Sequence, residues 1–416
     1  MTPRRERSAP LRLLIATEKA SRRIAAVRDD RLCDFSIMGA GETSLIGQIY
    51  LGRVTKIDRG LEAAFVDCGV GQVGFLPLRD APPGMTEGQS LIVQATREPF
   101  DGKAMRLTGR PVMTGYRLSL APSAKSPTYP DGITDAEKQG LQRALGTIGD
   151  LRRNISLRPP AIGADAALLP AEAESLQVKW AEIESKAAAA RGPQILHPAP
   201  EPLLEFIRAH VSSLGEILCD TRVAATQVAA LCRTLDDDLA EKVTFHPRRD
   251  WLPSVAELEE QIDEALADEV VLPSGAMLHF AATRAMTVID VDSGKAALEG
   301  VGAKAERSFL KINLEAATEV AGQIRLRNLG GIVVIDFIDL RARELRQQLV
   351  DRLRTAVAGD PQPVWVGAMS RLGLLELTRQ RGGPTLAARL LQDCTICGSR
   401  HRVPREELRP WIGSGI

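Results

Sequence analysis

The sequence has few aromatic residues and no net charge. Only 4% of its 416 residues are Phe, Trp or Tyr, and 53 basic residues balance 53 acidic ones. A chain without net charge has no overall attraction to nucleic acid, so RNA binding would have to come from local basic patches. Because aromatic residues are scarce, those that belong to a functional pattern are easier to recognise.

Long apolar runs and a disulfide framework are also missing. No apolar stretch approaches the length that crosses a bilayer, and Arg12 interrupts the short apolar run near the N-terminus, so this segment is not a secretory signal. Four of the six cysteines stand singly in apolar patterns, as buried thiols do in a reducing compartment: Cys33, Cys68, Cys219 and Cys232. We therefore expect a cytoplasmic protein without membrane association, long enough for two to four domains.

Two aspartates end short apolar runs that are typical of buried strands. Asp290 follows Met-Thr-Val-Ile, and Asp339 follows Ile-Val-Val-Ile-Asp-Phe-Ile. A carboxylate at the rim of a buried sheet must be paired, hydrogen-bonded or metal-bound, and two of them favour a hard cation such as Mg2+ or Mn2+. From the spacing alone, turn or helix-capping roles are equally compatible. Asp336 is expected to face the other side of its strand and to accept hydrogen bonds within the fold.

The pattern of the chain predicts several folding units. Glycines separate short alternating strands over residues 46–80, which indicates a small barrel. The irregular stretch 122–202 is expected to contain helices near 134–147 and 170–190. Strands and helices alternate over 270–390, including a helix that starts near Leu374, and this alternation is typical of a layered α/β domain.

Seven segments, in order, resemble the ribonuclease E/G family. Among them are Leu-Glu-Ala-Ala-Phe-Val-Asp-Cys-Gly at 61–69, Thr-Val-Ile-Asp-Val-Asp-Ser-Gly at 287–294 and Ser-Arg-Leu-Gly-Leu-Leu-Glu-Leu-Thr-Arg-Gln-Arg at 370–381. The others lie at 47–57, 74–78, 313–317 and 325–339, and a Cys-x-x-Cys follows. Since the chain stops soon after this motif, the resemblance implies a short member without the C-terminal small domain and scaffold tail.

The resemblance implies an α/β multidomain fold. Residues 1–40 and 203–268 would form a split RNase H-like structural subdomain, interrupted by an S1-type OB-fold barrel at 41–121 and a 5′-sensor-like insert at 122–202. A DNase-I-like catalytic domain at 269–390, a zinc-link at 391–403 and a C-terminal tail at 404–416 would follow.

The implied activity is that of a Mg2+-dependent endoribonuclease in RNA processing or decay. It would cut single-stranded RNA hydrolytically and leave a 5′-phosphate and a 3′-hydroxyl. Asp290 and Asp339 match the family's metal-binding aspartates, while Asp292 stands where better-known members have asparagine and can only accept hydrogen bonds when ionised. The alternative is a non-catalytic RNA-binding regulator that keeps the fold. A sugar-transfer enzyme using the Asp-x-Asp at 290–292 lacks any nucleotide-sugar pattern.

The resemblance also assigns RNA-binding residues. Phe65 and Phe75 match base-stacking aromatics, although core positions are the competing interpretation, and Lys103 matches a basic contact. Arg158 matches the arginine of an Arg-Thr pair that grips a 5′-monophosphate, but Pro159 replaces the threonine and supplies neither a hydroxyl nor an N–H. Arg371, with Arg325 and Arg327, is a candidate for phosphate contacts near the cut, and solvated or ion-paired roles compete.

The Cys394-Thr-Ile-Cys397 motif has the spacing of a metal site but offers only two thiolates. In the family, two chains each contribute such a pair to one four-cysteine zinc site, so half a site implies a homodimer, possibly within a higher oligomer. His401 is a rival ligand that would close a site within one chain, and Thr395 replaces the proline usual in this motif.

Overall fold

The computed structural model divides the chain into two compact units. The first contains residues 1–37, 215–225 and 244–416, and the second contains 38–214 and 226–243. The structure describes all residues except 1–8, 19–20, 40–43, 100–103, 131–132, 147, 149–152, 166, 248–251, 284, 296–302, 395, 397–401 and 405–416. Of the helices in this described part, none combines the length and the hydropathy that crossing a bilayer requires.

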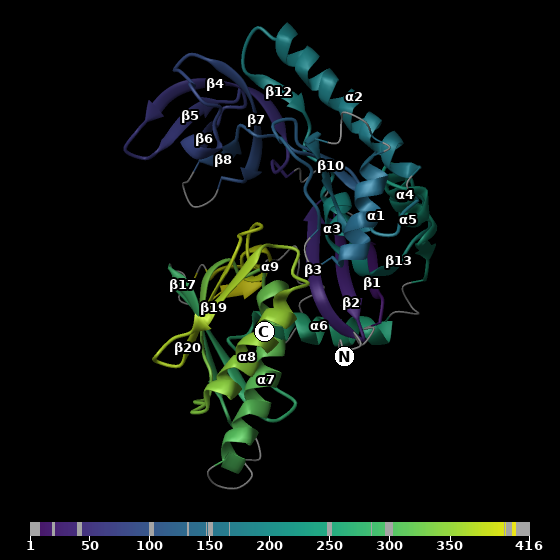
Figure 1. Cartoon of the computed structure of the whole chain (residues 1–416). Coiled ribbons are helices and arrows are strands. Elements are labelled where there is room, and N and C mark those ends of the chain that lie inside the picture. Colours follow the sequence, from purple (N-terminus) through teal and green to yellow (C-terminus); the bar gives the residue numbers. More distant parts are fainter. Residues whose placement is uncertain are drawn as a thin grey trace. The chain divides into compact units, whose positions relative to one another are not determined.

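A five-stranded sheet in the first unit combines strands from distant parts of the sequence. The strand order is β14-β13-β1-β2-β3, so the N-terminal strands lie beside strands that follow about two hundred residues later (Figure 1). The bounds are β1 Leu11–Glu18, β2 Ser21–Arg28, β3 Arg31–Gly39, β13 Leu214–Cys219 and β14 Val243–Phe245. Helix α6 (Leu252–Leu266) shares an apolar core with this sheet through Leu258 and Ile262, which contribute beside Leu14.

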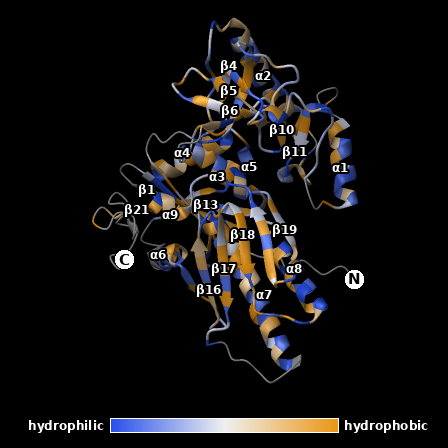
Figure 2. Cartoon of the chain, turned by 90° about the vertical axis from the view of Figure 1, so that its left-hand side faces the viewer, coloured by the Kyte–Doolittle hydropathy of each residue, from blue (hydrophilic) through white to orange (hydrophobic). Residues whose placement is uncertain are grey.

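A six-stranded mixed sheet forms the second layer of the first unit. Its order is β15-β16-β17-β18-β20-β19, in which β17 and β18 are parallel and the other neighbours are antiparallel. The bounds are β15 Glu269–Val271, β16 Met277–Ala282, β17 Met286–Asp292, β18 Gly331–Asp336, β19 Val364–Met369 and β20 Leu374–Arg379. Figure 2 shows stretches of hydrophobic residues along β17, β18 and β19, as expected for strands that line a core.

Helices α7 (Ala303–Leu326) and α8 (Arg343–Val357) supply the other half of that core. Ile289, Ile335 and Leu377 of the sheet are buried in one cluster with Val320 of α7 and Leu349 of α8. The residues that alternate with these along the same strands are exposed or only half-buried. We call this side, opposite α7 and α8, the open face of the sheet.

Strand β20 stands where the sequence predicts a helix starting near Leu374, and that prediction was wrong. Leu375, Leu377 and Arg379 are buried, whereas Glu376 and Thr378 are exposed, which is the period of two of a strand. Leucine and glutamate favour helices, but the pairing of β20 with both β18 and β19 outweighs this local preference.

The first unit ends in a short helix and a hairpin. Helix α9 (Leu386–Leu390) begins at Thr385, whose Oγ1 accepts a hydrogen bond from the N–H of Ala388. Strands β21 (Leu391–Asp393) and β22 (Arg402–Pro404) then pair antiparallel. The hairpin brackets the Cys-x-x-Cys segment.

The second unit contains a closed, OB-like barrel, as the sequence predicted. Strands β4, β5, β6, β8 and β7 follow one another around the barrel, and β7 pairs back with β4, while β12 lies outside the ring beside β4. The bounds are β4 Ile49–Asp58, β5 Ala63–Asp67, β6 Val73–Pro77, β7 Ser90–Arg97, β8 Met105–Thr108 and β12 Gln194–His197. A side chain at Gly74 would meet Leu107 at 2.2 Å, so glycine is required for the interior to close.

The remainder of the second unit packs helices on a small sheet of order β11-β10-β9. Helices α1 and α2 confirm the predicted pair, and α2 buries Leu169, Ala173, Leu176 and Trp180 at helical spacing. The bounds are β9 Met113–Thr114, β10 Leu118–Leu120, β11 Ile155–Leu157, α1 Asp135–Gly146, α2 Leu168–Ala189, α3 Pro202–His210 and α5 Asp237–Glu241. Helix α4 (Arg222–Arg233) belongs partly to each unit, and short 3-10 helices lie at Leu78–Asp80, Pro159–Ala161 and Val211–Ser213.

Candidate active site and RNA-binding surface

Three aspartates gather at one end of the open face. Asp290, in β17, and Asp336, the last residue of β18, are direct partners in the parallel ladder, so their side chains leave the sheet on the same side. Both are exposed, as is Asp339 in the segment that follows β18. The structure therefore brings the two predicted metal ligands, Asp290 and Asp339, to the same strand ends.

Asp336 belongs to this acidic group, which corrects the sequence-based expectation. It does not face away from Asp290, and it accepts no hydrogen bond from any described residue. Partial burial, together with the negative charges of Asp290 and Asp339, raises the pKa of Asp336. Carboxylates whose pKa is raised by their neighbours are held together against repulsion, which a bound cation would relieve.

The donors suit a cation that retains water. In the described part of the chain, no three His, Cys, Asp or Glu side chains are arranged as a ready metal cage. Asp290, Asp336 and Asp339 also form no ion pair or hydrogen bond with a described residue through their carboxylates. Mg2+ is commonly held by one or two carboxylates with water and substrate phosphate completing its octahedron. Asp290 and Asp339 could supply one or two such carboxylates to a cation.

Asp292 lies two residues beyond Asp290, on the same side of β17. Its Oδ1 accepts a hydrogen bond of 2.9 Å from the N–H of Gly294. This bond closes a turn in which Gly294 has a φ of +50°. Asp292 is exposed, so its second oxygen faces solvent rather than a described donor.

The turn between β19 and β20 approaches Asp339. Gly373 has a φ of +85°, and a Cβ on it would lie 3.3 Å from Oδ1 of Asp339. The hydroxyl of Ser370 accepts hydrogen bonds from the N–H groups of Leu372 and Leu374, which fixes the turn. Arg371, the predicted phosphate contact, is exposed in this turn close in sequence to Gly373.

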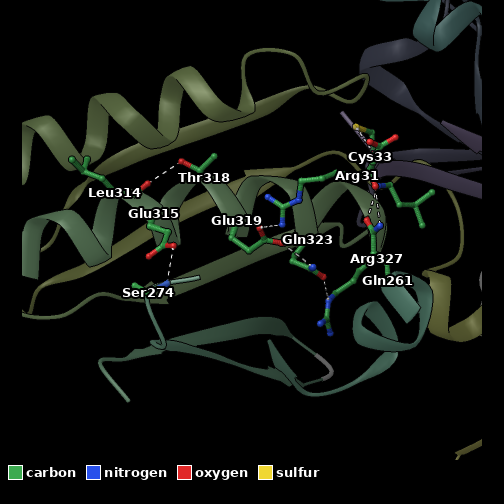
Figure 3. Close-up of polar contacts among 12 residues, drawn as sticks. Arg31, Cys33, Gln261, Ser274, Leu314, Glu315, Thr318, Glu319, Gln323 and Arg327 are labelled. Carbon is green, nitrogen blue, oxygen red and sulfur yellow. Dashed lines mark hydrogen bonds and ion pairs between the residues drawn. The ribbon is translucent and has the colours of Figure 1, made fainter. Parts of the chain in front are cut away.

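Arg327 is not available for phosphate binding. Its side chain is buried near the end of α7, where Nη1 and Nη2 donate to the carbonyl oxygens of Ala267 and Glu264. Its Nε donates to Gln323, one link of the polar network in Figure 3. Arg325 belongs to the last turn of α7, on the side of the sheet away from the aspartates. It donates to the carbonyl oxygen of Gly359. The sequence left a phosphate contact and a solvated or ion-paired role open for Arg327, and its burial excludes the phosphate contact.

A row of aromatic and basic residues crosses the outside of the barrel. Phe65 of β5 pairs with Phe75 of β6, and the rings meet edge to face with centroids 6.1 Å apart. Lys56 flanks Phe65 on β4, and Arg106 flanks Phe75 on β8. Both phenylalanines are only half-buried, whereas their neighbours Val66 and Leu76 are fully buried. Neither phenylalanine belongs to the apolar core cluster of the barrel. Lys103 lies outside the described residues.

Arg158 is half-buried and already bound within the second unit. Its Nη1 donates to the carbonyl oxygens of Gly115 at 2.6 Å and Tyr116 at 3.0 Å. Burial, followed by the positive charge of Arg208, lowers the pKa of Arg158. Pro159 starts a 3-10 helix and has no N–H to donate.

Only part of the predicted zinc site can be placed. Cys394 directly follows β21 and is half-buried. Cys397 and His401 lie outside the described residues. The pairing of β21 with β22 brings the chain back on itself around this segment.

Comparison with known proteins decides the family. The model of the Ribonuclease E/G family matches residues 114–382, more than half of the chain. The chain belongs to the ribonuclease E/G family. Ribonuclease E of Haemophilus influenzae is 32% identical over 95% of this chain, and ribonuclease E of Escherichia coli is 32% identical over the same share. Ribonuclease G of Escherichia coli is 28% identical, and the match covers 85% of its length.

The ribonuclease E/G resemblance read from the sequence is thus confirmed. The chain spans 44% and 39% of the length of the two ribonuclease E relatives, so it corresponds to less than half of either. The family match includes Asp290, Asp339 and Arg371 but begins after the barrel. The sequence interpretation missed Lys56 and Arg106 and gave Asp336 another role, because the positions of all three follow only from cross-strand pairing.

Proposed function

We propose that this member of the ribonuclease E/G family is a Mg2+-dependent endoribonuclease acting on single-stranded RNA in the cytoplasm, in RNA processing or decay. The observation that carries the proposal is the acidic group on the open face, where Asp290 and Asp336 are paired and Asp339 adds a third negative charge. The names of the relatives, ribonuclease E and ribonuclease G, support the same class of activity.

Asp290 and Asp339 would hold the metal through hard carboxylate oxygens. When bound there, Mg2+ supplies a Lewis acid that stabilises charge on the phosphate and makes water a better nucleophile. The ionised carboxylate of Asp292 is positioned to accept a hydrogen bond from water on the same side of β17. Arg371, exposed in the turn whose Gly373 approaches Asp339, would contact a phosphate of the strand. Hydrolysis in this way leaves a 5′-phosphate and a 3′-hydroxyl.

The barrel would supply most of the affinity for RNA. Bases stack on aromatic rings with a contribution of roughly 1–3 kcal/mol per base and with little sequence preference. Phe65 and Phe75, flanked by Lys56 and Arg106, provide such rings beside two cations, and Lys103 would add a third. This arrangement suits single strands, whose bases are free to unstack.

The domain assignments are part of the proposal. The five-stranded sheet with α6 would be the RNase H-like structural subdomain, the barrel the S1-type OB-fold, and the β9–β11 region the 5′-sensor-like insert. The six-stranded sheet would be the DNase-I-like catalytic domain. Cys394 and Cys397 would form half of a zinc-link whose other half comes from a second copy of the chain, since tetrahedral zinc needs four ligands.

A cleavage assay tests the proposal. A fluorescent A/U-rich single-stranded oligoribonucleotide is incubated with the protein in Mg2+ and, as a control, in EDTA. We expect internal cuts only with Mg2+, and products whose 3′ ends can be extended by a polymerase that requires a 3′-hydroxyl. Binding without cuts would support the non-catalytic RNA-binding alternative, and 2′,3′-cyclic phosphate ends would contradict the hydrolytic mechanism.

A further inference from the structure

Trp365 is an exposed aromatic residue on the open face, the side that carries the acidic group. It is 62% exposed, although tryptophan is among the most buried residues on average. Trp365 pairs with Thr378 of β20, which pairs with Ile332 of β18, which in turn pairs with Met286 of β17. The ladder therefore places Trp365 in a row across four strands, all with side chains on the open face.

The indole lies along its own strand. A Cβ on Gly367, two residues further along β19, would lie 3.3–3.4 Å from the six-membered ring of Trp365. Because Gly367 has no side chain, the ring rests over the glycine with one side toward the strand and remains largely open to solvent. A flat aromatic surface held in this way is a platform on which another ring can stack.

The row lies a short distance from the candidate active site. Asp336 lies four positions after Ile332 in β18, which is about 13 Å at the rise of a strand. Two strand spacings, about 10 Å, separate β18 from the edge strand β19. An RNA strand bound at the aspartates would therefore reach Trp365 within a few nucleotides.

Two arginines lie near Trp365, at the same edge or end of the sheet. The guanidinium of Arg354, from α8, reaches the β19 edge and lies 3.4 Å from the carbonyl oxygen of Gly367. Arg381 is exposed at the same end of the sheet and donates to Gly330. Single-strand binding sites combine an aromatic platform with such cations, which attract the phosphates.

The patch is too small and too interrupted for a protein interface. The polar Thr378 separates Trp365 from Ile332. A stable protein interface buries about 800 Å² per partner, whereas one aromatic side chain buries about 150–250 Å². The area offered by a single indole is that of one stacked base.

We propose that Trp365 is a second base-stacking site, separate from the barrel, that holds one nucleobase of single-stranded RNA a few nucleotides from the cut. This inference rests on the proposed function, because it takes RNA to be the ligand of the open face. The stacked base can be of any identity, since every base offers a π surface.

The test measures binding in EDTA, so it does not depend on cleavage. Anisotropy titrations compare a short single-stranded RNA with an abasic backbone of the same length, using Trp365→Ala, Trp365→Phe and the wild type. Val271→Ala is the matched control, because Val271 is also apolar, 62% exposed and on the open face, but in β15 at the opposite edge.

We expect Trp365→Ala to weaken binding of the RNA by about 5-fold to 150-fold, the equivalent of losing one stacked base. Trp365→Phe should restore most of the affinity, and the abasic strand should bind wild type and Trp365→Ala equally. The dependence of affinity on salt should not change, because no phosphate contact is lost.

Equal RNA affinity of Trp365→Ala and Val271→Ala would overturn the inference. So would a change in the oligomeric state of Trp365→Ala with unchanged RNA binding, since that would make the patch an interface between copies of the chain. If the wild type binds RNA through Trp365 but does not cut it with Mg2+, the proposed function fails and the stacking site stands.

Discussion

Gly373, which has no side chain, lies against the carboxylate of Asp339. Asp339 follows the end of β18, so strand geometry does not fix the direction of its side chain. Gly373 provides the neighbouring surface, with a φ of +85° and a position at which a Cβ would lie 3.3 Å from Oδ1 of Asp339, a tight contact. The backbone of one turn thereby limits where a proposed metal ligand can lie.

Gly373→Ala should therefore reduce RNA cleavage while RNA binding stays unchanged. The added methyl would shift the carboxylate of Asp339 or the turn by a few tenths of an ångström, and the left-handed backbone adds strain of about 1 kcal/mol or more. Gly84→Ala is the control for strain alone, because Gly84 has a φ of +74° and no atom within 4 Å of its would-be Cβ. Equal cleavage by the two variants would contradict the positioning role.

The sequence is informative about single residues where a strand pattern ends in a charge. Asp290 and Asp339 are predictable because each terminates an apolar run, and the family resemblance identifies the same pair. Asp336 was misread because its distance from Asp339 suggests opposite faces, whereas β18 ends at Asp336 and the alternation stops there. Its partnership with Asp290 comes from the register between two strands more than forty residues apart, which no local pattern encodes.

At the scale of elements, one arginine ties α6 to α7 within the first unit. Arg327 donates to the carbonyl groups of Glu264, in the last turn of α6, and of Ala267, just beyond it, and its guanidinium lies 4.0 Å from the ring centre of Phe280. Burial is the main cause that lowers its pKa to about 10. The ion pair of Arg31 with Glu319, at 2.7 Å, joins β3 to the same helix (Figure 3).

Arg327→Lys should lower the free energy of unfolding by about 2 kcal/mol or more, because one ammonium cannot replace a fork that bonds three acceptors. Chemical denaturation measures the change. Arg325→Lys, two residues earlier in the last turn of α7, serves as the control, since Arg325 makes one long bond of 3.5 Å and should shift stability by less than about 0.5 kcal/mol. Equal destabilisation by both variants would show that the fork of Arg327 is not what joins the helices.

The elements differ in how far the sequence predicts them. The barrel and helices α1, α2 and α8 follow from glycine placement and apolar spacing, which are local signals. Strand β20 does not, because its leucines and glutamate suit a helix and only its position between β18 and β19 selects the strand. Its pairing with these distant strands therefore determines that the segment is a strand.

For the whole molecule, the region around Arg158 predicts how the 5′ end of RNA affects cleavage. The Nη1 of Arg158 already donates to two backbone carbonyl groups, and Pro159 has no N–H to donate. We expect a 5′-monophosphorylated RNA to be cut at nearly the same rate as its 5′-hydroxyl twin, because a charged hydrogen bond worth about 1.5–3 kcal/mol is absent. Competition kinetics with both RNAs measure the ratio, and a strong preference for the monophosphate would require other donors.

Zinc content tests the proposed assembly. Two thiolates per chain predict about one zinc per two chains. Replacing both Cys394 and Cys397 by serine should release the metal and the dimer together, as native mass spectrometry would show. A zinc-bound monomer of the wild type would instead indicate that His401 and a further ligand close the site within one chain.

The central claim is that Asp290 and Asp339 hold the catalytic metal, and one paired measurement tests it. Asp290→Asn and Asp339→Asn are each assayed for cleavage of single-stranded RNA at saturating Mg2+ and for RNA affinity in EDTA. We expect cleavage to be abolished in both variants while affinity stays close to that of the wild type, because the barrel and its cations supply most of the binding. Cleavage near the wild-type rate by either variant would contradict the claim.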